Sequence, residues 1–511
     1  MSPPYVNAMV ARIDTRSGAL AVRTSLTGLP PVFLFRRNGG VDLSSPFIPR
    51  VAHGALAPDL DGVADTLRWG HPIDGRTLFA DLQVVLANSV VTVQSNGSVA
   101  NPPPAPWPDG AEFSGLTREQ IVAEQVVAFS SAAKRFDTSG AFVSLSGGLD
   151  SRASLVSLLS ENHRPLCVTM AGSPGNLDAC LAAAVCRACS LEHRTVLLDE
   201  GFARRAPDLV MQAAGLTGGV SCLSQTADLF LYEQLAGKFR TRISGNLGNQ
   251  VGRGGVESLS AYRPEPAVFA SGVRARLDAR PVAPWFIERL VSGDYGAVLF
   301  GQEVHFWSIA NYVVGSAHAR QLTPYADRRL LYLSRAAFTR DPQLQPPTWK
   351  GLRARDLRHR LRGTERGLSF QREFLARRGT MTEQVPLNWG WRAAGGWSPK
   401  WRAYAMTSAA DAAMIKYGAK PGVARPLVKW LGAKLGHRSA LVDWPMLVKS
   451  RLREVARDTF SSTIVRQAGI FDCARLDQML SEHFGDEADH HGTVSRCLEI
   501  ALGVLCRDSA P

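Results

Sequence analysis

The sequence predicts a mixed α/β protein, in which a β-rich N-terminal part precedes a parallel sheet with helices on both faces. Two patterns carry this prediction. Residues 1–100 hold short apolar or alternating segments that turn residues interrupt, which is typical of antiparallel strands. From Thr117 onward, apolar strands alternate with helical segments, which is typical of a parallel sheet. The length of 511 residues leaves room for two or three domains.

The N-terminal part consists of short expected strands with clear breaks between them. Turn-forming residues at 37–40 and 95–97 favour hairpins. The expected strands are 7–13, 19–24, 32–36 and 90–93. A proline-rich stretch begins after Asn101, and its missing N–H donors prevent a regular element. We therefore predict a domain over residues 1–100 and a stiff linker over residues 101–115.

The second part opens with a helix start signal. Thr117 and Gln120 have the spacing of a capping box, so we expect a helix from Ile121 to about Arg135. Beyond it, the expected strands are 141–145, 166–170 and 195–198, and the expected helices are 153–159 and 177–190. The chain from about 265 to 511 is mostly helix-compatible. We assign residues 116–511 to one domain.

Composition and charge exclude a membrane-spanning chain. Hydrophobic residues make up 45% and charged residues 20%, and no apolar run approaches the about 18–20 residues that cross a bilayer. The N-terminus lacks a basic segment followed by an apolar one, so we expect a cytoplasmic protein without a signal peptide. The sequence holds eight cysteines, and Cys186 and Cys189 form a CxxC within a helical segment. Buried helical cysteines are the favoured interpretation there over a metal or redox site.

The net charge of +13 comes largely from arginine. Six arginines at 353–366 alternate with leucines, which predicts an amphipathic helix with a solvated basic face. A groove for an acidic partner is the second interpretation.

The most informative segment, residues 144–151, reads Ser-Leu-Ser-Gly-Gly-Leu-Asp-Ser. It lies between an expected strand and an expected helix. Glycines in the turn let the backbone approach an anion, and the helix N-terminus presents N–H groups to a phosphate. Asp150 supplies an oxygen ligand for Mg²⁺. The predicted ATP-binding residues of this loop are Ser146, Gly147, Gly148, Leu149, Asp150 and Ser151.

No Gly-Lys-Ser/Thr follows this loop, so it is not a Walker A motif, and it is not the dinucleotide GxGxxG. It resembles the pyrophosphate (PP) loop of the ATP pyrophosphatases. That resemblance implies that ATP and Mg²⁺ are bound and that ATP is split between its α and β phosphates.

Further segments are similar to the class B asparagine synthetases and their relatives, the β-lactam and lasso-peptide macrolactam synthetases. The similar segments are 70–99, 169–178, 191–193, 243–250 and 322–327. The resemblance implies an Ntn-like glutamine amidotransferase domain followed by an adenine-nucleotide α-hydrolase-like synthetase domain. It also implies that adenine lies at Met170 and Ala171, and that Gly245, Asn249 and Gln250 form a second phosphate-side loop.

The departures from this family are as informative as the matches. The family's glutaminase needs a cysteine at position 2; here that position is Ser2, and no cysteine precedes Cys167. We therefore expect a degenerate N-terminal domain that makes no ammonia from glutamine. The second loop usually ends in Asp-Glu, where this chain has Asn249 and Gln250, and a glutamate of the family falls on Arg320.

The family also places a catalytic lysine in a later flexible loop. Our candidates for that role are Arg392 and Lys400. They lie in the segment 386–401, which holds four tryptophans. These rings suit the wall of an apolar substrate site and core packing equally well.

The resemblance predicts an AMP- and pyrophosphate-forming ligase that adenylates a carboxylate of a small molecule or peptide and joins it to an amine. Intramolecular attack by the amine would give a lactam or macrolactam. Three alternatives stay open: a glutamine-hydrolysing asparagine synthetase, a non-catalytic pseudo-synthetase, and a tRNA-modifying ATP pyrophosphatase. We do not expect nucleic acid as a partner of the ligase. Relatives often form homodimers, so a homodimer stays open.

Overall fold

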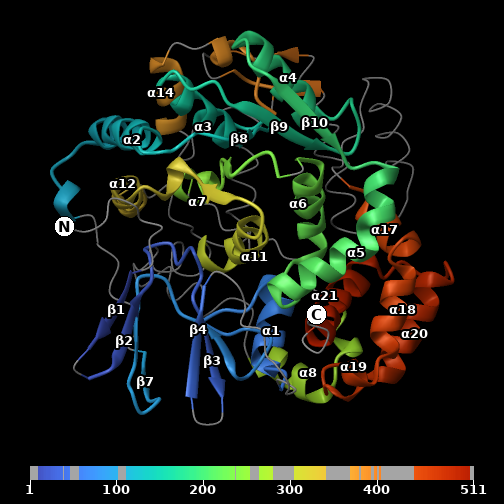
Figure 1. Cartoon of the computed structure of the whole chain (residues 1–511). Coiled ribbons are helices and arrows are strands. Elements are labelled where there is room, and N and C mark those ends of the chain that lie inside the picture. The colour runs from blue at the N-terminus through green and yellow to red at the C-terminus, as the bar shows by residue number, and fades with distance from the viewer. Residues whose placement is uncertain are drawn as a thin grey trace.

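The computed structural model describes most of the chain. The described residues are 10–15, 17–37, 40–45, 57–101, 111–235, 237–253, 264–279, 304–340, 369–378, 381–388, 390–392, 396, 398–399, 402–403 and 442–506. Figure 1 shows the N-terminal strands on one side of the molecule, the C-terminal helices beside them, and a second sheet with its helices across the top. The predicted mixed α/β class is confirmed.

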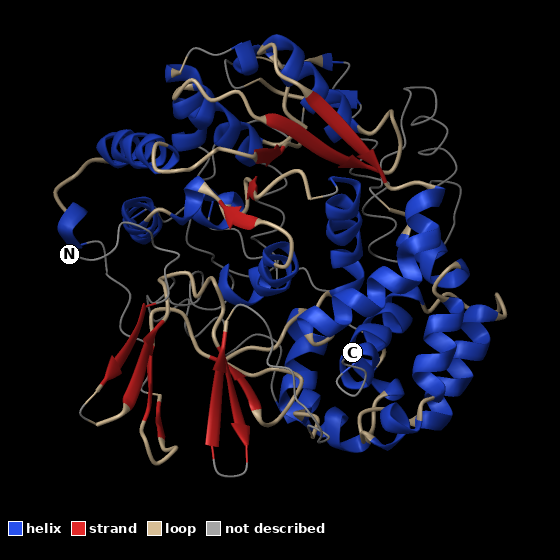
Figure 2. Ribbon diagram, viewed as in Figure 1, coloured by secondary structure: helices blue, strands red, loops and turns tan. Residues whose placement is uncertain are grey.

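The N-terminal strands form two small antiparallel sheets, which Figure 2 shows as two groups of red arrows. The first has the order β1-β2-β6-β7, with β1 Val10–Asp14, β2 Ala19–Arg23, β6 Val90–Val93 and β7 Val99–Ala100. The second has the order β4-β3-β5, with β4 Gly40–Ser44, β3 Phe33–Arg37 and β5 Leu82–Val84. The four strands expected from sequence are confirmed, with shifted ends. The expected turn at 95–97 is also present, because Gln94 N–H donates to Ser98 O at 2.8 Å.

One helix of this part, α1 (Leu60–Trp69), is missing from the sequence prediction. Its start is fixed by Asp59, whose carboxylate accepts from Asp61 and Gly62 N–H, and its end by Gly70 in a left-handed conformation. The helix is followed by the segment that leads to β5. It buries Val63 and Leu67 against the C-terminal helices.

The predicted capping box is confirmed. Thr117 Oγ1 accepts from Gln120 N–H at 3.2 Å, and Gln120 Oε1 accepts from Thr117 N–H at 2.7 Å. Helix α2 (Arg118–Ala133) follows and buries Phe129 against helices α12 (Arg328–Arg340) and α14 (Ser369–Arg377). Phe113, in the 3₁₀ turn Ala111–Phe113 at the end of the predicted linker, packs in the same cluster. Residues 102–110 of that linker lie outside the described part of the chain.

The second sheet has five strands, all parallel, in the order β10-β9-β8-β11-β12. Its strands are β8 Ala141–Ser144, β9 Leu166–Ala171, β10 His193–Leu197, β11 Thr241–Ile243 and β12 Arg320–Leu322. Helix α3 (Leu149–Leu159) connects β8 to β9, and α4 (Leu177–Ala188) connects β9 to β10. Helices α5 (Glu200–Thr217) and α6 (Cys222–Leu235) lie between β10 and β11. The predicted parallel sheet is confirmed. Strand β12 interrupts the part expected to be mostly helical.

Helices cover both faces of this sheet because its strands are apolar on both sides. Val143 of β8 and Cys167 of β9 pack with α3 and α4 on one face. Phe142 of β8 and Val168 of β9 pack on the other face with residues of α5 and α6. Figure 1 shows these two layers of helices on either side of β8, β9 and β10.

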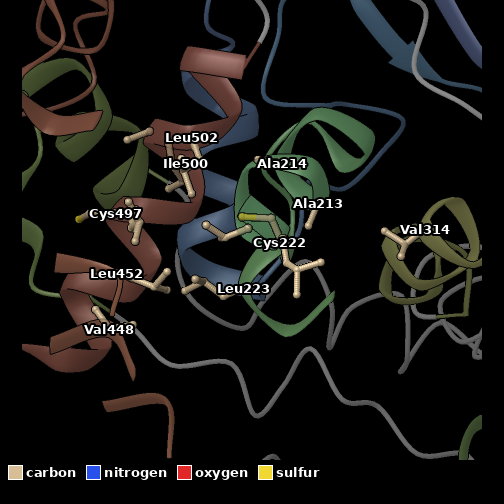
Figure 3. Close-up of a cluster of buried hydrophobic side chains, with 14 of the residues drawn as sticks. Ala213, Ala214, Cys222, Leu223, Val314, Val448, Leu452, Cys497, Ile500 and Leu502 are labelled. Carbon is tan, nitrogen blue, oxygen red and sulfur yellow. The ribbon is translucent and has the colours of Figure 1, made fainter. Parts of the chain in front are cut away.

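The C-terminal helices close the molecule around a large apolar core. They include α8 Ser271–Ala279, α11 His305–Ser316, α17 Trp444–Ser450, α18 Arg453–Ser461, α19 Thr463–Gln467, α20 Cys473–Phe484 and α21 His491–Cys506. Figure 3 shows the centre of this core, where Ile500 and Leu502 of α21 face Ala214 and Cys222 of the α5–α6 pair. The basic helix expected over 353–366 lies outside the described residues.

The N-terminal part shares this core with the C-terminal helices. The cluster contains Phe33 and Leu67 together with Val273 of α8 and Val494 of α21. Polar contacts cross the same boundary: Arg68 donates to Leu277 O, Arg276 pairs with Asp61 at 3.4 Å, and Arg496 donates to Gly70 O at 3.4 Å. The N-terminal strands are therefore anchored to the rest of the chain by apolar burial. No helix among the described residues is long and apolar enough to cross a membrane.

Two buried histidines lie at this boundary. His305, the first residue of α11, packs against the backbone of Gly28 so closely that a methyl group there would lie 2.6 Å from the imidazole ring. His71 donates from Nδ1 to Pro72 O at 2.8 Å and stacks on Phe306. Burial lowers the pKa of His71 to about 4 and that of His305 to about 3.

These histidines predict an acid-sensitive fold. Both folded-state pKa values lie below the ordinary 6.5, so as pH falls the unfolded chain takes up protons that the folded chain excludes. Their contribution to stability is complete above pH 6.5, and by pH 5 each histidine costs about 2 kcal/mol. Urea unfolding at pH 7.5 and pH 5.0 measures this loss. The variant His305→Leu should lower the measured loss by about 2 kcal/mol, because His71 and other histidines with lowered pKa values, such as His483, still contribute. The variant His163→Leu, at a partly exposed position, should keep the wild-type difference. If His305→Leu lost as much stability between pH 7.5 and pH 5.0 as the wild type, His305 would not be one of the titrating groups.

Candidate functional site

The predicted loop follows the strand at which the direction of the sheet reverses. From β8 the chain proceeds to β9 and β10 on one side, and then to β11 and β12 on the other side. In parallel α/β sheets, ligands bind at the carboxyl ends of the strands where this reversal opens a crevice. The loop after β8 and the loop after β11 both lie at this edge, so the topology places residues 145–148 and 244–247 side by side where such a crevice is expected.

The first loop is closed by its own hydroxyl groups. Ser146 Oγ and Ser151 Oγ lie 2.9 Å apart, and Ser151 Oγ accepts from Ser146 N–H at 3.0 Å. Gly148 N–H donates to Ser146 Oγ at 3.2 Å. Gly148 is also the N-cap of α3 and has no side chain to bond the first-turn N–H groups. That helix end is therefore suited to an anion.

The second loop touches the first at two glycines. A methyl group on Gly245 would lie 2.5 Å from Ser151 N, and a methyl group on Gly248 would lie 2.5 Å from Asp150 Cβ. The sequence prediction includes Gly245 and misses Gly248. Both positions need glycine because any side chain would push the two loops apart.

Asp178 connects the first loop to helix α4. Its carboxylate accepts from Gly147 N–H at 2.9 Å. Burial raises the pKa of Asp178, and the hydrogen bond from Gly147 opposes this rise. A methyl group on Gly147 would lie 2.6 Å from Leu181 Cδ1, so this glycine packs directly against α4.

Arg152 fastens a distant segment to the first loop. Its guanidinium is fully buried and donates to Pro386 O at 2.9 Å, to Thr382 O at 3.1 Å and to Val385 O. Asn388 N–H donates to Gly147 O at 3.0 Å. The described partners of the guanidinium are all carbonyl oxygens, and burial lowers the pKa of Arg152 to about 9. Segment 382–388 is thereby held against the loop.

Asp150, the predicted Mg²⁺ ligand, is held by two side chains that the sequence prediction misses. Gln371 Nε2 donates to Asp150 Oδ1 at 2.6 Å, and Tyr325 OH donates to the Asp150 carbonyl at 3.2 Å. Tyr325 lies in the segment 322–327 that carries part of the family resemblance, which was a usable signal. Gln371 belongs to no recognisable motif.

A buried polar network supports the second loop from below. Arg242 of β11 donates to Asp228 Oδ1 at 2.6 Å and to Ser144 Oγ at 2.7 Å. Burial is the largest single effect and lowers the pKa of Arg242, but the charges and hydrogen bonds of Asp228 and Tyr232 together outweigh it and raise the pKa above its usual value. Asn311 of α11 donates to Asp228 Oδ2 at 3.1 Å and accepts from Asn246 Nδ2 at 2.8 Å. The loop after β11 is thus tied to α6 and α11.

The remaining predicted binding residues lie at the same edge of the sheet. Met170 and Ala171 end β9, next to β8, and Ala171 is buried. Asn249 and Gln250 lie in α7 (Gly248–Arg253), directly after the glycine that touches Asp150. Arg320 pairs with Thr241 in the sheet, so it lies at the amino end of β12, away from the crevice.

The predicted catalytic cations are not brought to the loop by any described contact. Arg392 N–H donates to Gly396 O at 3.1 Å, and Lys400 lies outside the described residues. Trp391, one of the four tryptophans of this segment, is buried in a cluster with Phe370 and Phe374, and the Arg372 guanidinium lies 5.4 Å from its ring centre. Trp391 therefore packs in the core. The other three tryptophans lie outside the described residues.

Comparison with known proteins adds no further identification. No model of a protein family matches the chain, and a search of curated proteins finds no match.

The contacts of Arg152 predict a large structural effect. In the variant Arg152→Met, buried carbonyl groups lose their donors, so we expect the free energy of unfolding to fall by about 2–4 kcal/mol. Segment 382–388 should become the first site of cleavage by a protease. Urea unfolding and limited proteolysis measure the two effects. Arg194→Met, which removes one exposed bond to Gln234 O, should change stability by no more than about 0.5 kcal/mol. Equal proteolysis of both variants would show that Arg152 does not hold the segment.

Proposed function

We propose that this protein is an ATP-dependent, AMP-forming amide ligase, similar in its chemistry to the asparagine synthetases. One observation carries the proposal: the Ser146–Ser151 loop and the Gly245–Gly248 loop meet at the reversal point of a parallel sheet. This is where a nucleotide binds in open α/β folds. The five-stranded sheet also supports an adenine-nucleotide α-hydrolase-like fold for this part, and the two antiparallel sheets support an Ntn-like N-terminal domain.

The residues of the crevice fit ATP and Mg²⁺. The N-terminus of α3 has no side-chain cap, so its N–H groups suit the phosphates. The carboxyl end of β9, at Met170 and Ala171, suits the adenine. Among the described residues, no group of three histidine, cysteine, aspartate or glutamate side chains could hold a metal. Mg²⁺ commonly takes only one or two carboxylates and completes its shell with phosphate oxygens and water, so Asp150 suffices as a protein ligand.

In the proposed reaction, a substrate carboxylate attacks the α-phosphorus of ATP, the bond to the β-phosphate oxygen breaks, and pyrophosphate leaves. Mg²⁺ would neutralise charge on the pyrophosphate. The first-turn N–H groups of α3 would hold the phosphates, while Asp150 orients the cation. An amine then attacks the acyl carbon, loses a proton, and expels AMP to give the amide. Segment 382–388, held by Arg152, would limit access of water to the adenylate.

The source of the amine follows from the residues of the N-terminal domain. Ser2 stands where the family has its nucleophilic cysteine, and the first cysteine of this sequence is Cys167. We therefore propose that the amine comes from the substrate itself, from a second small molecule or from free ammonia. An amine on the same substrate would give a lactam.

A pseudo-synthetase is the second candidate function. Asn249 and Gln250 stand where the family has carboxylates, and amides bind Mg²⁺ less strongly. In addition, the N–H groups of Gly147 and Gly148 are occupied by Asp178 and Ser146. A protein of this kind would bind ATP weakly or not at all.

Exchange of labelled pyrophosphate into ATP separates the two functions. With Mg²⁺ and a panel of amino acids and peptide carboxylates, we expect exchange that depends on one acid. Asp150→Asn keeps the side-chain shape but removes the charge, so it should lower the exchange rate at least about a hundredfold. Asp458→Asn, at an exposed position far along the chain, should keep the wild-type rate. Absence of exchange with every acid, together with no ATP binding by calorimetry, would favour the pseudo-synthetase.

A glycine variant tests the crevice directly. In Gly248→Ala the new methyl group would lie 2.5 Å from Asp150 Cβ and 2.9 Å from its Oδ1, so Asp150 must move. We expect ATP affinity, measured by calorimetry with Mg²⁺, to fall at least tenfold. In Gly215→Ala no described atom lies within 4 Å of the new methyl group, and affinity should be unchanged. Equal ATP affinities in the two variants would show that ATP does not bind in this crevice.

A further inference from the structure

Gln371 reaches the Asp150 carboxylate from a helix more than two hundred residues further along the chain. It lies in α14, is fully buried, and brings Nε2 within 2.6 Å of Asp150 Oδ1 and 3.1 Å of Tyr325 OH. Tyr325 OH in turn donates to the carbonyl of Asp150. The carboxylate and the backbone of one residue are therefore held by two linked side chains.

Chemistry fixes the orientation of the Gln371 amide. With Nε2 toward Asp150, a donor faces a carboxylate oxygen; the flipped amide would place two acceptors 2.6 Å apart. Gln371 Oε1 has no hydrogen-bond partner among the described residues, which is the expected cost of this choice.

The surroundings leave Gln371 no other position. Methyl groups on Gly252 would lie 2.7–2.9 Å from its amide atoms, so the helix α7 backbone packs against the amide without a gap. Its neighbours Phe370 and Phe374 pack on Phe129 with ring centres 5.8 Å and 5.0 Å away. Helix α14 is thus fixed to α2, and Gln371 is fixed with it.

A neutral amide donor orients a carboxylate without neutralising it. Lysine or arginine at this position would form an ion pair and compete with a divalent cation for Asp150. Glutamate would place a second negative charge beside the first, which is unfavourable until a cation binds. The neutral donor of Gln371 directs Asp150 and adds no charge that would oppose a cation.

We propose that Gln371 is a positioning residue that holds the Asp150 carboxylate in place for the divalent cation that bridges the phosphates of ATP. This inference rests on the proposed function of the crevice. It adds a residue that no motif of the sequence marks.

The test uses the full-length chain, Mn²⁺ as the cation, and an ATP analogue with a methylene group between the α and β phosphorus atoms. Electron paramagnetic resonance measures bound Mn²⁺. In Gln371→Met the carboxylate loses the Gln371 donor, so Mn²⁺ affinity in the presence of the analogue should fall about tenfold. In Gln371→Glu, which is nearly isosteric, Mn²⁺ affinity should rise about tenfold, and added Mn²⁺ should raise the melting temperature more than in the wild type.

Gln467, an exposed residue of α19, supplies the control. Gln467→Met and Gln467→Glu should leave Mn²⁺ affinity unchanged. If Gln371 had a purely structural role, both of its variants would bind Mn²⁺ more weakly. A fall of Mn²⁺ affinity in Gln371→Met together with a rise in Gln371→Glu therefore supports the positioning role. The Gln371→Glu variant need not be stable without a cation for this purpose, because it is measured with Mn²⁺ present.

The outcomes separate this inference from the proposed function. If the wild type exchanges pyrophosphate and binds Mn²⁺ with the analogue, but the two Gln371 variants bind Mn²⁺ as the wild type does or both bind it more weakly, the role of Gln371 is wrong and the ligase proposal stands. If the wild type neither exchanges pyrophosphate nor binds Mn²⁺ with the analogue, both are wrong.

Discussion

The close contact between two loops is the constraint on which the candidate site depends. Gly245 and Gly248 bring the loop after β11 against Asp150 and Ser151, at a separation that no side chain would permit. Because the loops touch, the N-terminus of α3, the Asp150 carboxylate and the loop after β11 lie together at the carboxyl edge of the sheet. The order of the strands places these loops side by side, and the helices around them hold that arrangement.

Charge is distributed around the crevice in an uneven way. Arg152 is buried among carbonyl groups, whereas Arg242 is matched by Asp228. The first arginine thus contributes a net positive charge beneath the loop, together with the N-terminus of α3. Asp150, in the first turn of α3, has a neutral amide as one of its partners. Under the proposed function, this combination suits a polyanion that arrives with its own cation.

The sequence alone was sufficient for the parts that local rules determine. The capping box at Thr117, the strand–turn–helix around Gly147 and Gly148, and the parallel sheet follow from short-range patterns. Helix α1 was missed although Asp59 and Gly70 are local start and stop signals; its apolar face is covered by α8, more than 200 residues away. Gln371 and Gly248 could not be predicted because their roles arise from contacts across the fold. The assignment of Arg392 and Lys400 stays a prediction, since it rests on resemblance alone.

Helix α11 spans the distance between the N-terminal strands and the crevice. At its first residue, His305 is pressed against Gly28; less than two turns later, Asn311 bonds Asn246 in the second loop. A helix of this length is stiff, so a tilt imposed at one end is transmitted to the other as a displacement of similar size. The N-terminal strands therefore act as a brace for the loop geometry. This contribution is mechanical and independent of any reaction in the N-terminal part.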